Sequence, residues 1–230
     1  WFGDLQRNPP EVQAMVQGDA PFHGLARTLD WQLQDTLEQA DQVTLCFALD
    51  LPDGLPGWPH AAGVRLQIEL GEQLQLRLTT RNLGSTPLAF SQALHSYFAV
   101  SDIRQVSVRG LDGCRYIETL DNWSEQRQAG DLQFAGETDR IYLDLPPRLE
   151  IDDPLWQRRL VLEARGSRSA IVWNPWVDKS TRLTQFAADA WQGMLCIETA
   201  NVLDDAVLLA PGEEHELGFV LFSEELGGDC

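Results

Sequence analysis

Two short apolar segments, far apart in the chain, each carry one side chain that can transfer a proton. His95 lies in Ala93-Leu94-His95-Ser96-Tyr97-Phe98, and Glu198 lies in Met194-Leu195-Cys196-Ile197-Glu198-Thr199-Ala200-Asn201. A histidine and a carboxylate held on a rigid sheet can add one proton to a substrate while another is removed. Structural roles are the alternatives: His95 could be a core-edge residue bonded to a backbone carbonyl, and Glu198 could point outward from its strand.

A second histidine is followed closely by a cation. The segment Pro21-Phe22-His23-Gly24-Leu25-Ala26-Arg27 turns at its glycine. In a functional interpretation, His23 would donate a hydrogen bond to a substrate oxygen and Arg27 would be an anion clamp, because the planar guanidinium matches phosphate geometry. The simpler alternative is a loop histidine beside a surface arginine.

Asp139 is the remaining candidate for substrate binding. It enters an apolar strand-like run, Thr138-Asp139-Arg140-Ile141-Tyr142, where it could accept hydrogen bonds from substrate hydroxyls or cap the start of the strand. His60 and His215 have the neighbours of surface or loop residues, and we expect no catalytic role for either.

Composition narrows the class of partner. The 230 residues include 35 acidic and 17 basic ones, for a net charge of −18, which argues against nucleic acid and against anionic membrane surfaces. No apolar run approaches the ~20 residues of a membrane span, and no signal-peptide pattern is present. Four widely spaced cysteines favour free thiols in a reducing cytosol over a disulfide framework or a zinc site: Cys46, Cys114, Cys196 and Cys230. We find no P-loop, dinucleotide fingerprint or metal-spaced cluster, and we expect no cofactor and no metal.

Strand-like runs separated by turn residues dominate the chain. Residues 73–81 alternate polar and apolar side chains, which predicts a strand with one buried face, and Gly71-Glu72 predicts a hairpin turn before it. The candidate helices, 10–17 and 178–186, are short. We therefore predict an all-β fold of two packed antiparallel sheets in one domain, with further strands at 42–49, 63–70, 87–94, 105–109, 140–143, 149–151, 157–164, 170–173, 192–199 and 214–222.

These segments together resemble the signature stretches of the hexose-6-phosphate mutarotases, within the aldose 1-epimerase superfamily. The segments around His23, His95, Asp139 and Glu198 follow in the family's order, with Trp1-Phe2-Gly3 before them and Val172-Trp173-Asn174-Pro175 between the last two. The resemblance covers essentially the whole chain. Leu25 stands where the family usually has an aromatic residue, and the family's N-terminal strands, with an arginine expected to bind phosphate, do not precede Trp1.

The resemblance implies a galactose mutarotase-like antiparallel β-sandwich over residues 1–230. It implies that His95 is the general acid and Glu198 the general base, that His23 and Asp139 hold sugar hydroxyls and that Arg27 helps to hold a phosphate. The expected reaction is interconversion of the α and β anomers of a hexose 6-phosphate, by a cytoplasmic monomer. Three alternatives stay open: an aldose 1-epimerase for unphosphorylated sugars, a non-catalytic carbohydrate-binding sandwich, and a glycosidase using Asp139 and Glu198.

Overall fold

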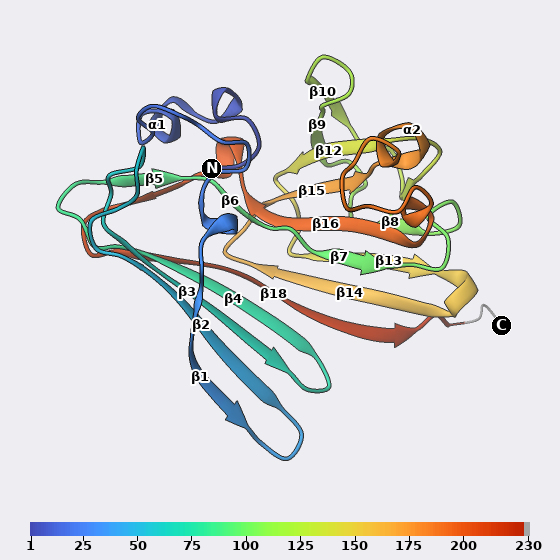
Figure 1. Ribbon diagram of the computed structural model, residues 1–230. Coiled ribbons are helices and arrows are strands. Elements are labelled where there is room, and N and C mark those ends of the chain that lie inside the picture. The colour runs from blue at the N-terminus through green and yellow to red at the C-terminus, as the bar shows by residue number, and fades with distance from the viewer. Residues whose placement is uncertain (228–230) are drawn as a thin grey trace. The chain divides into compact units, whose positions relative to one another are not determined.

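The computed structural model describes residues 1–227, which are organised almost entirely in antiparallel strands (Figure 1). Within that range the α-helices are the short α1 (Pro10–Gln13) and α2 (Trp176–Ser180). The chain also contains short 3-10 helices, such as η2 (Ala26–Thr28). The predicted all-β class is confirmed. None of the helices in the described part of the chain has the length and apolar character needed to cross a membrane.

The chain divides into two compact units, which we describe separately. The first comprises Trp1–Ala93, Arg165–Ser167 and Ala200–Val220, and the second comprises Leu94–Ala164, Arg168–Thr199 and 221–227. That residues 1–230 act as one domain stays a prediction.

The first unit is built on a sheet in the order β1-β2-β3-β4-β18 (Figure 1). A separate pair, β5 with β17, closes a small core of Ala62, Leu88, Phe90, Val207 and Leu209. The predicted turn at 71–72 joins β3 to β4 in a hairpin that begins with Leu70 opposite Leu74. The strand bounds are β1 (Gln32–Glu38), β2 (Val43–Leu51), β3 (Ala62–Leu70), β4 (Leu74–Asn82), β5 (Leu88–Phe90), β17 (Val207–Leu209) and β18 (Glu214–Glu225).

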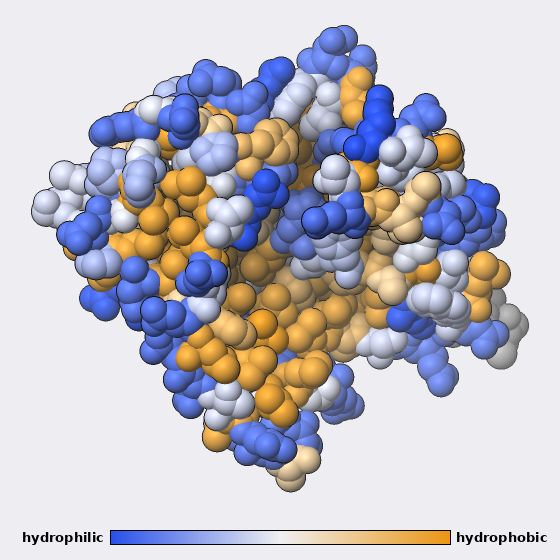
Figure 2. Space-filling model, in the orientation of Figure 1, coloured by the Kyte–Doolittle hydropathy of each residue, from blue (hydrophilic) through white to orange (hydrophobic). Residues whose placement is uncertain are grey.

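The predicted single buried face of β4 is wrong, because residues Leu74 to Thr79 are all half-buried. Polar side chains on this face bond to one another: Glu69 of β3 accepts a hydrogen bond from Arg77 of β4 and another, at 2.7 Å, from Gln67 of its own strand. Apolar side chains gather over β1 to β4 on the face visible in Figure 2. Neither face is fully buried or fully exposed along this stretch.

The second unit contains two sheets. One has the order β18-β14-β13-β8-β11, and the other has the order β10-β9-β12-β15-β16-β6, with β7 also paired to β16. Both supply fully buried side chains, such as Val108, Ile151 and Val161 from the first and Ile141, Ile171 and Ile197 from the second. The bounds are β6 (Gln92–Leu94), β7 (Tyr97–Ala99), β8 (Ser107–Arg109), β9 (Arg115–Glu118), β10 (Ser124–Arg127), β11 (Leu132–Gln133), β12 (Thr138–Leu143), β13 (Arg148–Asp153), β14 (Arg158–Arg165), β15 (Ser169–Asn174) and β16 (Met194–Asn201).

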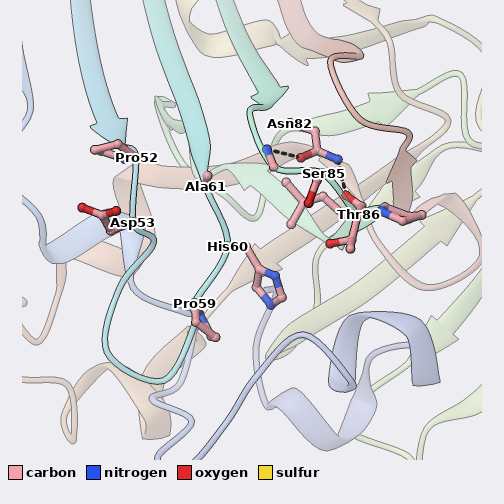
Figure 3. A pocket seen from close by; sticks show the side chains of 11 residues that line it. Pro52, Asp53, Pro59, His60, Ala61, Asn82, Ser85 and Thr86 are labelled. Atoms are coloured by element: carbon pink, nitrogen blue, oxygen red, sulfur yellow. Dashed lines mark hydrogen bonds between the residues drawn. The ribbon is translucent and has the colours of Figure 1, made fainter.

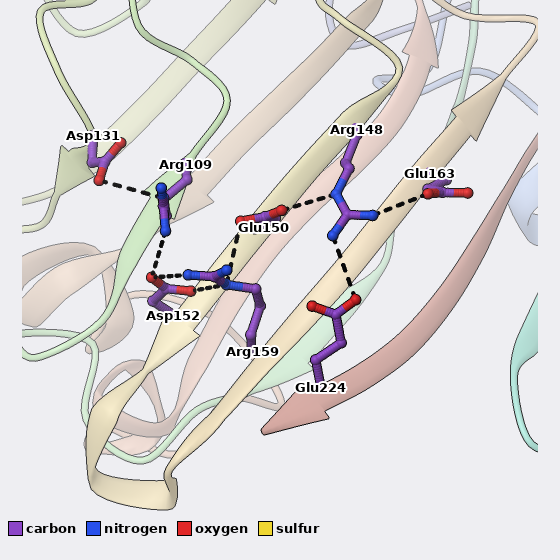
Figure 4. Close-up of polar contacts among 8 residues, drawn as sticks. All are labelled: Arg109, Asp131, Arg148, Glu150, Asp152, Arg159, Glu163 and Glu224. Atoms are coloured by element: carbon purple, nitrogen blue, oxygen red, sulfur yellow. Dashed lines mark hydrogen bonds and ion pairs between the residues drawn. The ribbon is translucent and has the colours of Figure 1, made fainter. Parts of the chain in front are cut away.

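Arginines and carboxylates form a continuous ion-pair network on the β8-β13-β14-β18 sheet of this unit (Figure 4). Arg159 pairs with Asp152 at 2.6 Å and with Glu150 at 3.2 Å. Arg148 pairs with Glu150 at 2.8 Å and reaches Glu163 and Glu224. Networked charges of this kind contribute more to stability than isolated surface pairs do.

Some sequence expectations need correction. The helix predicted for 10–17 ends at Gln13, because the amides of Met15 and Val16 donate to carbonyls only three residues back and the Gln17 amide donates to the Gly57 carbonyl. The segment 178–186 is helical only to Ser180. His215 lies on β18, where its Nε2 is 3.0 Å from Asn201 Oδ1, and is not in a loop. Among the described residues the cysteines are free thiols, and Cys230 lies outside the described residues.

Candidate active site

His95 and Glu198 meet because β7 pairs antiparallel with β16. Tyr97 lies opposite Cys196 and Ala99 lies opposite Met194, so this register, continued by two residues, sets position 95 opposite position 198. The His95 Nε2 atom lies 3.3 Å from Glu198 Oε1. Two groups capable of proton transfer are therefore in direct contact, although their segments are far apart in the sequence.

Glu198 is buried on a strand whose residues are all buried, and its relative exposure is 4%. Burial, followed by the negative charge of Asp139, raises the pKa of Glu198 from 4.5 to about 8. A carboxyl group with a pKa near the working pH can both accept and return a proton, as a general base must. The exposed, outward-facing alternative for Glu198 does not fit this placement.

Asp139 reaches the same site from β12. This strand pairs antiparallel with β15, and Asp139 lies opposite Trp173. Burial raises the pKa of Asp139, and the ammonium of Lys179 opposes that rise. The Lys179 Nζ atom lies 3.7 Å from Asp139 Oδ2.

Aromatic rings flank the histidine. The Tyr97 ring stacks on His95, with centroids 4.9 Å apart and planes 9° apart, and its relative exposure is 58%. Trp173 meets both rings edge-on, at 6.2 Å from His95 and 6.4 Å from Tyr97. Flat apolar rings beside polar groups are suited to contact the carbon faces of a sugar.

Sequence reasoning did not single out Tyr97, Trp173 or Lys179 as site residues. One signal was available for Tyr97, because residues two apart on an extended chain share a face and Tyr97 follows His95 at that spacing. Lys179 has a different signal: it is the only lysine in the sequence.

We expect Tyr97→Ala to lower kcat by roughly tenfold, because the His95 ring then loses the surface that fixes its orientation. Tyr97→Phe keeps the ring and is the matched control, with a rate close to that of the unchanged protein. The catalytic rates of the three proteins, compared under the same conditions, provide the measurement. Equal loss in both variants would show that the phenol hydroxyl, and not the stacking, is what matters.

His23 and Arg27 belong to the first unit. The Gly3 amide donates to His23 Nδ1 at 3.2 Å, which in a neutral ring leaves the proton on Nε2. The Phe2 and Phe22 rings pack edge-on against this imidazole. Arg27 is exposed on η2. Their roles toward a sugar and a phosphate stay predictions.

The first unit also has a cavity of ≈ 230 Å³, in which Figure 3 shows His60, Asn82 and Asp53. The His60 Nε2 atom lies 2.8 Å from the Met15 carbonyl oxygen, and the Asn82 amide donates to the carbonyl of Thr86 at 2.8 Å. These polar groups are bonded within the unit, and the cavity contains none of the predicted site residues. In residues 1–227 no three or more His, Cys, Asp and Glu side chains form a group that could hold a metal ion.

Comparison with known proteins gives consistent matches. A family model described as aldose 1-epimerase matches residues 4–221. A Cenchrus ciliaris protein named "Putative glucose-6-phosphate 1-epimerase" is 33% identical, over 86% of this chain and 64% of that protein. A protein of the same name from Escherichia coli (strain K12) is 31% identical, over 87% of this chain and 64% of that protein. The chain thus spans just under two thirds of the length of these curated relatives.

A solved structure supports the same relationship. The crystal structure titled as a "putative mutarotase (YeaD)" from Salmonella typhimurium is similar, with a TM-score of 0.85 and 26% identity. The match covers 98% of this chain and 72% of that chain.

Proposed function

The chain belongs to the aldose 1-epimerase family, and from that premise we propose that it interconverts the α and β anomers of a hexose 6-phosphate, most simply glucose 6-phosphate. The contact between His95 and Glu198 carries this proposal, because it supplies an acid and a base side by side. The reaction is an isomerisation by general acid–base catalysis, in the cytoplasm.

The proposed chemistry moves two protons. The Glu198 carboxylate removes the proton from the anomeric hydroxyl, and the electron pair of that O–H bond forms the aldehyde C=O bond. The C1–O5 ring bond breaks as protonated His95 donates a proton to O5. Rotation about C1–C2 presents the other aldehyde face, and the reverse transfers close the ring as the other anomer. Each positioned group can contribute roughly 10²–10⁴-fold in rate.

The other side chains are proposed to hold the sugar. Asp139 would accept hydrogen bonds from ring hydroxyls, while Trp173 and Tyr97 would contact the apolar faces of the ring. His23 would donate a hydrogen bond from Nε2. Burial of Glu198 supports the assignment, because it makes the carboxylate a stronger base than an exposed glutamate would be.

Specificity for the 6-phosphate rests on two supports. The curated relatives bear the name of a glucose-6-phosphate 1-epimerase. Arg27 offers a guanidinium in the segment whose motif resembles that of the mutarotases. An aldose 1-epimerase for unphosphorylated sugars would share the proton chemistry and differ only in this clamp.

The deciding experiment follows anomerisation of freshly dissolved α-glucose 6-phosphate by one-dimensional NMR, with and without the protein and with α-glucose in parallel. We expect acceleration of the phosphorylated sugar alone. Acceleration of both sugars would instead indicate a general aldose 1-epimerase in which Arg27 contributes little. Sugar binding without acceleration would favour a carbohydrate-binding module, and release of a reducing sugar from a glycoside would favour a glycosidase.

A further inference from the structure

Lys179, the only lysine in the sequence, lies beside the site on α2. Its Nζ atom is 3.2 Å from Glu137 Oε1 and 3.7 Å from Asp139 Oδ2. The same ammonium lies 5.8 Å from the centroid of the Trp173 ring, on which it can make a cation–π contact. One cation is thus held by two carboxylates and an aromatic ring.

The turn that carries this lysine is firmly anchored in the second unit. Asn174 Oδ1 accepts a hydrogen bond from the Trp176 amide at 2.9 Å, and the Trp176 ring packs on Trp191 with centroids 4.6 Å apart. The Ser180 hydroxyl lies within hydrogen-bond distance of the carbonyl of Ala188, at 3.1 Å. Trp176 has φ 53°, a left-handed conformation that is costly for a residue with a side chain. This conformation directs the chain from β15 straight into α2.

We propose that Lys179 is a positioning residue whose ammonium holds the Asp139 carboxylate in place, so that Asp139 can accept hydrogen bonds from a sugar. The effect that we expect on the catalytic rate rests on the proposed function. The state of Asp139 itself can be measured in the absence of any substrate.

The charges around Asp139 explain why a cation is needed there. Asp139 is buried, and Glu137, Glu118 and Glu198 all present carboxyl groups toward this region. Burial and like charge both favour the protonated form of a carboxyl. Arg140 is already paired with Glu118 at 2.8 Å. Lys179 is the cation that lowers the pKa of Asp139 against these influences.

Removal of this charge should therefore impair activity in a pH-dependent way. In Lys179→Met the pKa of Asp139 rises, so that less of it is ionised at low pH and the fraction recovers as the pH increases. We expect kcat/KM to fall by roughly tenfold at pH 6 and by about twofold at pH 8.5, relative to the unchanged protein at each pH. Lys179→Arg keeps the charge and should restore most of the rate.

A matched control removes one positive charge elsewhere. Arg65 pairs with Asp50 at 2.7 Å, and both side chains are more than half exposed. Arg65→Met should leave kcat/KM unchanged at both pH values. A loss in Lys179→Met that is the same at every pH would show that Lys179 acts only on packing, and would overturn the proposal.

The single lysine also allows a direct test without substrate. Reductive methylation with ¹³C-formaldehyde labels Lys179 and the α-amino group, and it keeps the ammonium charge. Lys179→Arg identifies the Lys179 signal by its absence. We expect the chemical shift of that signal to change at acidic pH, as Asp139 gains a proton. This pH-dependent change should be absent in Asp139→Asn and present in Glu137→Gln.

The rate comparison and the NMR titration together separate the positioning role of Lys179 from the proposed function. A signal insensitive to Asp139→Asn would overturn the positioning role, whatever the protein catalyses. A step that depends on Asp139, in a protein that accelerates no anomerisation, would support the ionised Asp139–Lys179 pair and contradict the proposed function.

Discussion

Replacing Glu198 by Gln is expected to lower the rate of anomerisation by about 10²–10⁴-fold, because the amide cannot accept the proton of the anomeric hydroxyl. Because the mechanism also needs a protonated His95, the rate should fall at high pH. On the acidic side the unchanged protein should gain activity as the pH rises, since the pKa of Glu198 is about 8 and only its carboxylate can act as the base. The variant should lose this dependence. Rates measured by NMR between pH 6 and 9 test both statements.

The same substitution should make the protein more stable at alkaline pH. The pKa of Glu198 is about 8 in the folded protein, and its ordinary value of 4.5 applies to the unfolded chain. Between pH 4.5 and pH 8, the folded state therefore keeps a proton that the unfolded state has released. The free energy of unfolding therefore falls as the pH rises from about 4.5 to 8. In Glu198→Gln this penalty is absent, and we expect a gain on the order of 3–5 kcal/mol at pH 8.5 and under about 1 kcal/mol at pH 5.

Urea denaturation at the two pH values measures this gain. Glu72→Gln is the matched control, because Glu72 is an exposed carboxylate in the turn between β3 and β4. It should change neither the rate nor, by more than about 0.5 kcal/mol, the stability. An active Glu198→Gln variant would refute the assigned base, and equal gains at pH 5 and pH 8.5 would refute its raised pKa.

Replacing His95 by Asn should cost a similar factor in rate, about 10²–10⁴-fold, with a different effect on stability. Asparagine can still donate a hydrogen bond toward Glu198, but it cannot supply a proton to the ring oxygen. The His95 side chain is 40% exposed, so its replacement should change the free energy of unfolding by less than about 1 kcal/mol. Glu198 is thus expected to lower the stability of the folded protein at alkaline pH, while His95 is expected to have little effect on it.

His60→Gln is the comparison for His95→Asn. His60 is a partly buried histidine of the first unit, and Gln can still donate to the Met15 carbonyl. We expect an unchanged rate. Full activity in His95→Asn, or equal losses in both variants, would argue against a specific proton transfer by His95.

Much of the fold could be predicted from local pattern. The alternation in residues 63–82 with Gly71-Glu72 between its halves predicts the hairpin of β3 and β4, because both strands and their turn are contiguous in the chain. The strand β1 escaped prediction. Every residue of Gln32–Glu38 is exposed, so no buried face imposes an alternation of polar and apolar residues on this segment. Its backbone pairing with β2 makes it a strand. The strands β9 and β10 also escaped prediction; each has four residues, too few to display a clear alternation, although Tyr116 of β9 is buried.

For the site, the sequence by itself determined which residue types are available and in which segments they occur. It indicated His95, Glu198 and Asp139 as candidates through motifs that resemble those of a family. It also indicated His23 and Arg27, whose roles stay predictions.

Only the tertiary structure decided how these groups are arranged and what surrounds them. The β7–β16 register places His95 against Glu198, while strand pairing and α2 bring Asp139, Trp173 and Lys179 to the same unit. The pKa of Glu198 depends on burial and on the charge of Asp139, which lies on another strand. Desolvation and Coulomb interactions depend on distances through space, which a sequence of residue types does not contain.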